Sequence, residues 1–255
     1  MLFREQYDLP PRDPLWSAFV LLLLLVPILL LFVYFGLADH AFRLLGLSSD
    51  GASVLLAASL LGSVVNIPLT RRRIVLADAE SYPLPAPWHW LAPILHYYPP
   101  KVTVQVIALN VGGAIVPIVF STYLLVRLSP SIPAVLGATL SVTIVARVLA
   151  RPQPGVGVTL PVMVSPLVAA LASRGFVHLV GAPIAVAAPV AYIAGTLGTL
   201  IGADVLLLPA ILHGRLLPAG GVSGTSSTFV SSIGGAGVFD GIFLTGILAP
   251  FLATF

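Results

Sequence analysis

Long apolar stretches recur along the chain and are separated by short polar, Gly-rich or Pro-rich segments. A helix that crosses a membrane needs about 20 mainly apolar residues, because the hydrocarbon core is about 30 Å thick. Stretches that meet or approach this length cover residues 16–38, 51–69, 102–126, 132–149, 159–172, 182–212 and 233–255. The pattern therefore predicts an all-α, polytopic membrane helix bundle of about seven transmembrane segments, with residues 1–255 forming a single integral membrane domain.

Gly and Pro interrupt the later stretches. The sixth is long for one span and contains three prolines, and the seventh opens with several glycines. Since proline removes a backbone donor and breaks helices, we expect broken or re-entrant segments here. Residues 151–157, ahead of the short fifth stretch, are predicted to form a loop that dips back into the membrane or, alternatively, a plain turn.

Three segments are predicted to lie outside the spans. Residues 1–15 form a cytoplasmic tail, residues 70–101 form a Pro- and aromatic-rich interfacial loop, and residues 213–232 form a flexible Gly/Ser-rich loop. In the second of these, the prolines prevent a continuous helix and the Trp and Tyr rings favour the headgroup region. His89 and His96 lie in this loop without a third ligand at metal-binding spacing, so no metal site is predicted.

Composition narrows the class of protein. With 58% hydrophobic residues, 8% charged residues and a mean hydropathy of +1.06, the chain fits neither a soluble nor a disordered protein. A net charge of +3 is too small for a nucleic-acid-binding face. The absence of cysteine excludes disulfides, thiolate metal sites and cysteine nucleophiles. We predict no cofactor and no nucleic-acid partner.

Loop cations predict the orientation. Most Lys and Arg residues fall in the amino-terminal tail and in every second loop after it, whereas the opposite set holds Arg43, Arg127 and Arg174. Because cations in short loops stay on the cytoplasmic side, the amino terminus is predicted to be cytoplasmic, in a multi-pass protein of the cell membrane.

Two carboxylates within the apolar stretches are the main candidates for chemistry. Asp204 and Asp240 are each predicted to lie roughly 10–12 Å inside the bilayer, at matching depth, from the rise per residue of a helix. Burying a charged side chain there costs about 2.5–3.5 kcal/mol even on the lenient scale, so such residues point to function. Each neighbours a pair of glycines four residues apart, which lets helices pack closely. The pairs are Gly198 with Gly202 and Gly237 with Gly241.

The two aspartates support more than one chemical role. Close together, they could share a proton, which suits acid–base catalysis or proton-coupled transport, or they could hold a cation. Alternatively, each could cap backbone N–H groups at a helix break. Asn66 and Asn110 are predicted as buried amides beside helix breakers, where they either line a water-filled cavity or form interhelical hydrogen bonds.

Five segments carry a resemblance to a known family. They are Asn66–Leu69, Asn110–Ala114 with Pro117, residues 151–157, Ala191–Asp204 and Ser232–Phe243. By these segments the chain resembles the uncharacterised prokaryotic membrane protein family catalogued as domain of unknown function 1614. The resemblance implies a membrane location and little else.

Two protease motifs are matched only in part. Gly202-Ala203-Asp204 is similar to the Gly-x-Gly-Asp motif of presenilin-type and prepilin-type intramembrane aspartyl proteases. However, Ala203 replaces the second glycine, and Asp240 follows the motif instead of preceding it. Residues 221–224 match the Gly-x-Ser-Gly of rhomboid proteases, but no histidine follows His213, so we discount that activity.

Three functions remain open from the sequence. The first is a small transporter or channel with a proton- or cation-binding carboxylate pair. The second is an intramembrane aspartyl-protease-like hydrolase that uses the same pair as catalytic residues. The third is a non-catalytic subunit or scaffold whose glycine faces dock other membrane subunits. The expected partners are the lipid bilayer, a small ion or proton, and other membrane subunits.

Overall fold

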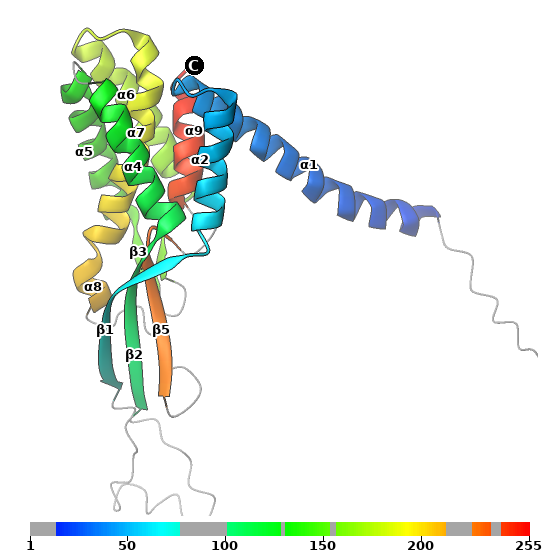
Figure 1. Ribbon diagram of the computed structural model, residues 1–255, viewed down its shortest axis with the longest axis vertical. Helices are drawn as coiled ribbons and strands as arrows, with labels where there is room; N and C mark the ends of the chain where they lie inside the picture. Colours follow the sequence, from blue (N-terminus) through cyan, green and yellow to red (C-terminus); the bar gives the residue numbers. More distant parts are fainter. Residues whose placement is uncertain (1–13, 77–100, 129–130, 154–156, 213–225, 236–240) are drawn as a thin grey trace, which may run out of the picture.

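The computed structural model shows a helical bundle with a small β-sheet at one end (Figure 1). It describes residues 14–76, 101–128, 131–153, 157–212, 226–235 and 241–255. The α-helices are α1 (Pro14–Leu44), α2 (Ser49–Gly62), α4 (Val116–Arg127), α5 (Ile132–Leu149), α6 (Val164–Leu179), α7 (Ala187–Thr199), α8 (Leu208–Leu212) and α9 (Gly241–Leu252). Two segments are wider π-helical turns: η2 (Val111–Ile115) precedes α4, and η5 (Leu200–Val205) follows α7. A 3₁₀ turn, η4 (Ile184–Val186), leads into α7.

The sheet has three strands in the order β1-β2-β5. These are β1 (Asn66–Leu76), β2 (Lys101–Asn110) and β5 (Ser226–Ile233). β1 and β2 are antiparallel, with Asn66 opposite Asn110, whereas β2 and β5 are parallel, with Leu109 opposite Ile233. β3 (Arg151–Gln153) and β4 (Gly157–Thr159) form a separate antiparallel pair.

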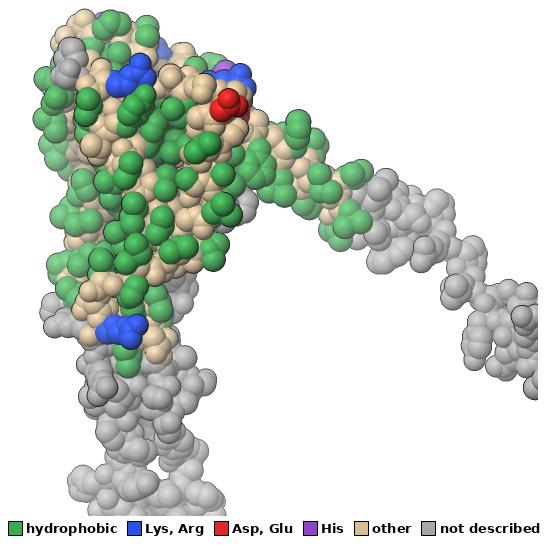
Figure 2. All heavy atoms as spheres, in the orientation of Figure 1, with side chains coloured by type: hydrophobic (Ala, Val, Ile, Leu, Met, Phe, Trp, Pro, Cys, Tyr) green, Lys and Arg blue, Asp and Glu red, His purple; other side chains and the backbone are tan. Residues whose placement is uncertain are grey.

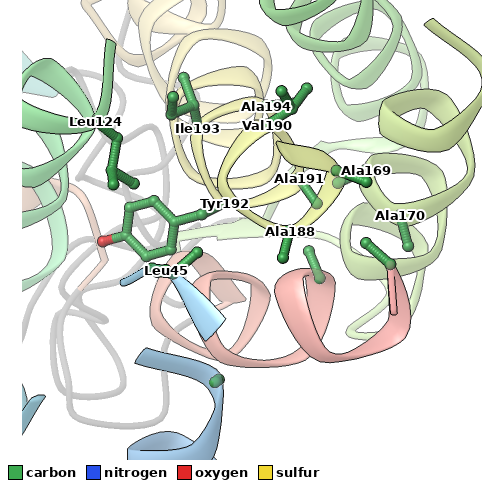
Figure 3. Close-up of a cluster of buried hydrophobic side chains, with 14 of the residues drawn as sticks. Leu45, Leu124, Ala169, Ala170, Ala188, Val190, Ala191, Tyr192, Ile193 and Ala194 are labelled. Carbon is green, nitrogen blue, oxygen red and sulfur yellow. The ribbon is translucent and has the colours of Figure 1, made fainter. Parts of the chain in front are cut away.

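Small side chains allow close packing inside the bundle. α7 is buried among α4, α5, α6 and α9, and half of its buried positions are Ala or Gly. Tyr192 is its largest buried side chain, and it lies beside Leu45 and Leu124 in the core cluster (Figure 3). Small residues at helix contacts are typical of helices that associate within membranes.

Large apolar side chains instead face outward. On α5, Leu136, Leu140, Ile144 and Val148 form an exposed row at four-residue spacing. Hydrophobic side chains cover the visible face of the bundle, and Lys and Arg side chains appear near its two ends (Figure 2). This distribution suits a protein whose sides contact lipid acyl chains.

Three helical segments among the described residues are long and apolar enough to cross a membrane. They are Leu22–Leu44, Ile132–Leu149 and Ile184–Leu212. Shorter apolar helices cover Ser49–Gly62, Val111–Arg127, Val164–Leu179 and Gly241–Leu252. α1 leaves the bundle, and the residues of its carboxyl-terminal part, among them Ala38 and Phe42, pack against the core (Figure 1). The chain is therefore mostly helical and has the helices of a membrane protein, but seven spans are not confirmed.

The sheet corrects the prediction that the chain is all-α. The expected third span, 102–126, begins as strand β2 and becomes helical only after Asn110. Parts of the predicted interfacial loop 70–101 and of the predicted loop 213–232 are strands, because β1 extends to Leu76 and β5 begins at Ser226. The β-branched residues of these strands fit a pleated sheet better than a helix.

The region around the expected fifth span also differs from the prediction. Residues 151–153 and 157–159 pair as the antiparallel strands β3 and β4. That this segment dips back into the membrane stays a prediction. The helix that follows, α6, begins at Val164 and ends at Leu179, later at both ends than the predicted stretch 159–172. Pro161 lies before the helix, where its missing N–H is tolerated.

Candidate functional site

The candidate site lies where the sheet meets the helical bundle. At this level α2 gives way to β1, β2 continues into η2 and α4, and β5 ends just before the segment that leads to α9. α7 also changes into the π-helical turn η5 here. Each change of secondary structure leaves backbone groups that need partners outside a regular helix, so polar side chains gather at this junction.

Asn110 joins three of these segments. Its side chain is 1% exposed, and its Oδ1 accepts a hydrogen bond from the Gly113 N–H at 2.7 Å, which caps the start of η2. Its Nδ2 donates to the Ser63 carbonyl oxygen at 2.7 Å and to Asn66 Oδ1 at 3.2 Å. A buried amide with these partners fixes the end of α2, the start of β1 and the start of η2 relative to one another.

Asn66 is exposed, which corrects the prediction that both amides are buried. Its Oδ1 accepts a hydrogen bond from Ser232 Oγ at 2.6 Å as well as the one from Asn110. The two asparagines therefore hydrogen-bond to each other across the antiparallel pair β1–β2, and Asn66 extends the network to β5.

Gly113 and Gly234 bring η2 against the end of β5. A Cβ on Gly113 would overlap the carbonyl oxygen of Gly234, and a Cβ on Gly234 would meet Ala114 at 2.6 Å. Gly234 also has a φ of +89°, a conformation that other residues rarely adopt. Only glycine at both positions allows the two backbones to approach this closely.

Asp204 lies in η5, where the helix widens. The Leu206 N–H donates to the Ile201 carbonyl oxygen at 2.9 Å, a π-helical bond, shortly before Pro209, which cannot donate one. Asp204 Oδ2 accepts a hydrogen bond from the Gly234 N–H at 2.7 Å. This carboxylate thus accepts a hydrogen bond from the backbone just after the end of β5.

A cavity of about 390 Å³ opens beside Asp204. Its walls are largely apolar and come from β5, the segment 157–162, η5, α8 and the start of α9. Thr199 and Ser231 also line it and are only 3% and 7% exposed. Neither hydroxyl oxygen has a hydrogen-bond partner within the part of the chain that the structure describes. Buried hydroxyls without partners are costly, so this pair is well suited to receive a ligand.

The structure brings some of the predicted site residues together and leaves others undescribed. Asn66, Asn110 and Asp204 belong to one junction, connected through Ser232, Gly113 and Gly234. Asp240 and Gly237 lie outside the described residues, so the geometry of the predicted carboxylate pair stays a prediction. Among the described residues, no group of three His, Cys, Asp or Glu side chains could hold a metal ion.

The predicted packing glycines differ in their surroundings. Gly198 and Gly202 lie against α5, where a Cβ would meet Val142 and the Thr143 carbonyl oxygen at 2.7 and 2.5 Å. Gly241 has no atom of another described residue within 4 Å of its Cβ position, and it lines the cavity instead.

Sequence reasoning missed Thr199 and Ser231 as site residues. Thr199 lies five residues before Asp204, within the glycine-containing segment 195–204. However, the hydroxyl of a threonine in a helix usually donates a hydrogen bond to a backbone carbonyl oxygen of the preceding turn, so it gives no signal of a site. Ser231 lies in a segment that was interpreted as a flexible loop. The β-branched and aromatic residues Thr228, Phe229 and Val230 were the available signal for a strand.

Comparison with known proteins identifies a family but no activity. A family model described as "Protein of unknown function (DUF1614)" matches residues 60–252, which include the whole junction. No curated protein and no solved structure matches the chain.

Proposed function

The chain belongs to the DUF1614 family of proteins of unknown function, and from the cavity at Asp204 we propose that it is a multi-pass membrane transporter or channel for a proton or small cation. The observation that carries this proposal is the meeting of one carboxylate with two unpartnered buried hydroxyls, those of Thr199 and Ser231, in one cavity. We further propose that it lies in the cell membrane with its amino terminus in the cytoplasm.

The chemistry of the cavity favours a small cation or a proton. Carboxylate and hydroxyl oxygens are hard ligands, which suit cations such as Na⁺ or K⁺ more than soft metals. The largely apolar walls lower the local dielectric constant and so strengthen the attraction between Asp204 and a positive charge. A carboxylate kept within a membrane helix is costly, and such residues commonly mark ion or proton paths.

The broken helices around the cavity support the same proposal. In many transporters the substrate site lies between discontinuous helices, whose exposed backbone groups line a cavity. Here η2 and η5 interrupt regular helical geometry next to the site, and the start of α9 contributes Gly241 to its wall. Asp240 directly precedes Gly241 in the sequence, which favours a second carboxylate near the same cavity.

Ion flux through proteoliposomes tests the proposal. The purified protein would be reconstituted with a pH-sensitive dye, or with dyes for Na⁺ and K⁺, and an ion gradient would be imposed. We expect flux for the wild-type protein and its loss, by at least tenfold, in Asp204→Asn. Asp39→Asn is the matched control, because Asp39 forms an ion pair with Arg43 at 2.8 Å outside the cavity.

Two outcomes would contradict the transport proposal. The first is the absence of flux for every cation with a folded wild-type protein. The second is flux that Asp204→Asn leaves unchanged. A parallel assay with single-span test substrates addresses the aspartyl-protease alternative, since cleavage without flux, lost in Asp204→Asn, would indicate a hydrolase.

A further inference from the structure

The two edge strands of the sheet differ in how they are protected. β1 contains Pro68 and Arg71, and its register with β2 shifts between Pro68 and Thr70. Proline, positive charge and bulges are the usual means by which edge strands avoid pairing with other chains. β5 has none of them: its sequence is Ser-Ser-Thr-Phe-Val-Ser-Ser-Ile, and its pairing with β2 is regular throughout.

The cavity beside Asp204 runs along this unprotected edge. Five consecutive residues of β5, Phe229–Ile233, line it. Successive side chains of a strand point to opposite faces, so consecutive residues reach one cavity only where it borders the backbone edge. Another part of the wall is built in the same way, since the consecutive residues 157–160, which include β4, line it.

We propose that the cavity binds an extended peptide segment of another protein, which adds to β5 as a further strand. Within the described residues, no strand pairs with the outer edge of β5. Backbone hydrogen bonds to that edge would supply affinity, as in other cases of strand addition. A five-residue segment is about 16 Å long, and 390 Å³ lies within the usual range of ligand sites.

The surroundings define the side chains of this segment. Ile107, Val158, Ile242 and other apolar residues form most of the wall, and the lining also contains the carboxylate of Asp204, so the segment is mainly apolar and carries no acidic side chain. Residues of β2, β4, β5, α7, η5, α8 and α9 line the cavity, which favours one strand over the edge of a second folded sheet. This inference goes beyond ion transport, and a bound segment would cover Asp204 and reduce flux.

A photoreactive peptide tests strand addition directly. The probe is the capped peptide Val-Thr-Val-Thr-Val with a diazirine on one side chain, mixed with the purified full-length protein. We expect crosslinks within residues 226–233 or 157–160. Two analogues are N-methylated, one at the odd-numbered and the other at the even-numbered amides of the peptide. Each keeps all the side chains but loses the N–H donors along one edge of the peptide strand. At least one analogue should bind tenfold or more weakly. Binding of both analogues as tight as that of the unmodified peptide, or the absence of these crosslinks, would overturn the proposal.

A matched pair of variants locates the site on β5. Val230 is 53% exposed and lines the cavity, whereas Thr228 lies on the same face of the strand but outside the lining. We expect Val230→Lys to lose probe binding and Thr228→Lys to retain it. Equal effects of the two substitutions would contradict the assignment. If a Val230→Cys protein oxidised to a disulfide-linked dimer without peptide, the edge of β5 would pair with a second copy of the chain. That result would overturn the proposal of a peptide from another protein.

Asp204→Asn separates this inference from the transport proposal. Strand addition uses backbone groups of β5, so this variant should bind the probe within about threefold of wild type while losing flux. Flux without probe binding would therefore refute only the docking site, and probe binding without flux would refute only the transporter. Cleavage of the bound probe would support docking and add a hydrolytic function.

Discussion

The Gly234 N–H donates a hydrogen bond to Asp204 Oδ2 at 2.7 Å, and this bond joins the end of β5 to the π-helical turn that follows α7. Gly234 can turn here because its φ of +89° suits glycine and because it lies against Ala114 without a side chain of its own. The position of the carboxylate in the cavity thus depends on the end of a strand that lies far away in the sequence.

Comparing Asp204→Ala with Asp204→Asn isolates this hydrogen bond, because both remove the charge but only Asn keeps an acceptor oxygen. We expect Asp204→Ala to be less stable than Asp204→Asn by about 1–3 kcal/mol, the cost of a buried N–H without a partner. The measurement is the free energy of unfolding in bicelles. Equal stabilities would show that the Gly234 N–H does not depend on Asp204.

The hydroxyl of Thr199 should serve ligand binding instead of stability. Thr199→Val replaces a buried hydroxyl that has no partner among the described residues, so we expect stability to stay the same or to rise by up to about 1 kcal/mol. Cation affinity, measured by flux at varied ion concentration, should fall.

Thr196→Val is the matched control on the same helix. Thr196 is equally buried, but its Oγ1 donates to the Tyr192 carbonyl oxygen at 2.8 Å and lies 3.3 Å from Ser121 Oγ. Its replacement should cost about 0.5–1.5 kcal/mol. If Thr199→Val were destabilising to the same degree, the Thr199 hydroxyl would have a structural role.

The sequence predicted the helices better than the sheet, for a physical reason. Hydropathy over a long window identifies apolar segments but does not distinguish a strand that continues into a helix from one long span. Residues 102–107, Val-Thr-Val-Gln-Val-Ile, alternate in part and are rich in β-branched residues, which indicates a strand. The partners of that strand, β1 and β5, lie far away in the sequence, so their pairing could not be derived from local pattern.

The candidate site was predictable in part. Asn66, Asn110 and Asp204 stand out because polar side chains within apolar, Gly- and Pro-containing segments need partners. The proximity of these residues could not be inferred, since it depends on the parallel pairing of β2 with β5 and on the contact between Gly113 and Gly234. The pairing of Asp204 with Asp240 stays a prediction.

Helix packing gives a third test, at Gly202 and Gly241. A Cβ on Gly202 would meet the Thr143 carbonyl oxygen and Ala146 on α5, so Gly202→Ala requires a backbone shift that costs about 1–3 kcal/mol. Gly241→Ala meets no described atom within 4 Å at its Cβ position and should change stability by less than about 1 kcal/mol. A larger loss for Gly241→Ala than for Gly202→Ala would contradict the packing of η5 against α5.

The two asparagines of the junction use their side chains differently, and this difference gives the fourth test. Asn110 donates through Nδ2 to two oxygens, whereas the hydrogen bonds of Asn66 described here are both accepted by its Oδ1. Aspartate has nearly the same shape as asparagine but no N–H donors. The same substitution should therefore destabilise the protein far more at Asn110 than at Asn66.

Asn110→Asp would place a buried carboxylate oxygen 2.7 Å from the Ser63 carbonyl oxygen and 3.2 Å from Asn66 Oδ1, with no cation to compensate it among the described residues. An uncompensated buried charge costs about 3–5 kcal/mol, so we expect this variant to unfold readily and to lose flux. Asn66→Asp keeps the acceptor for Asn110 and Ser232 at an exposed position, and it should lose less than about 1 kcal/mol. Both free energies of unfolding would be measured in bicelles at pH 7. Equal tolerance of the two substitutions would mean that Asn110 does not hold α2, β1 and η2 together.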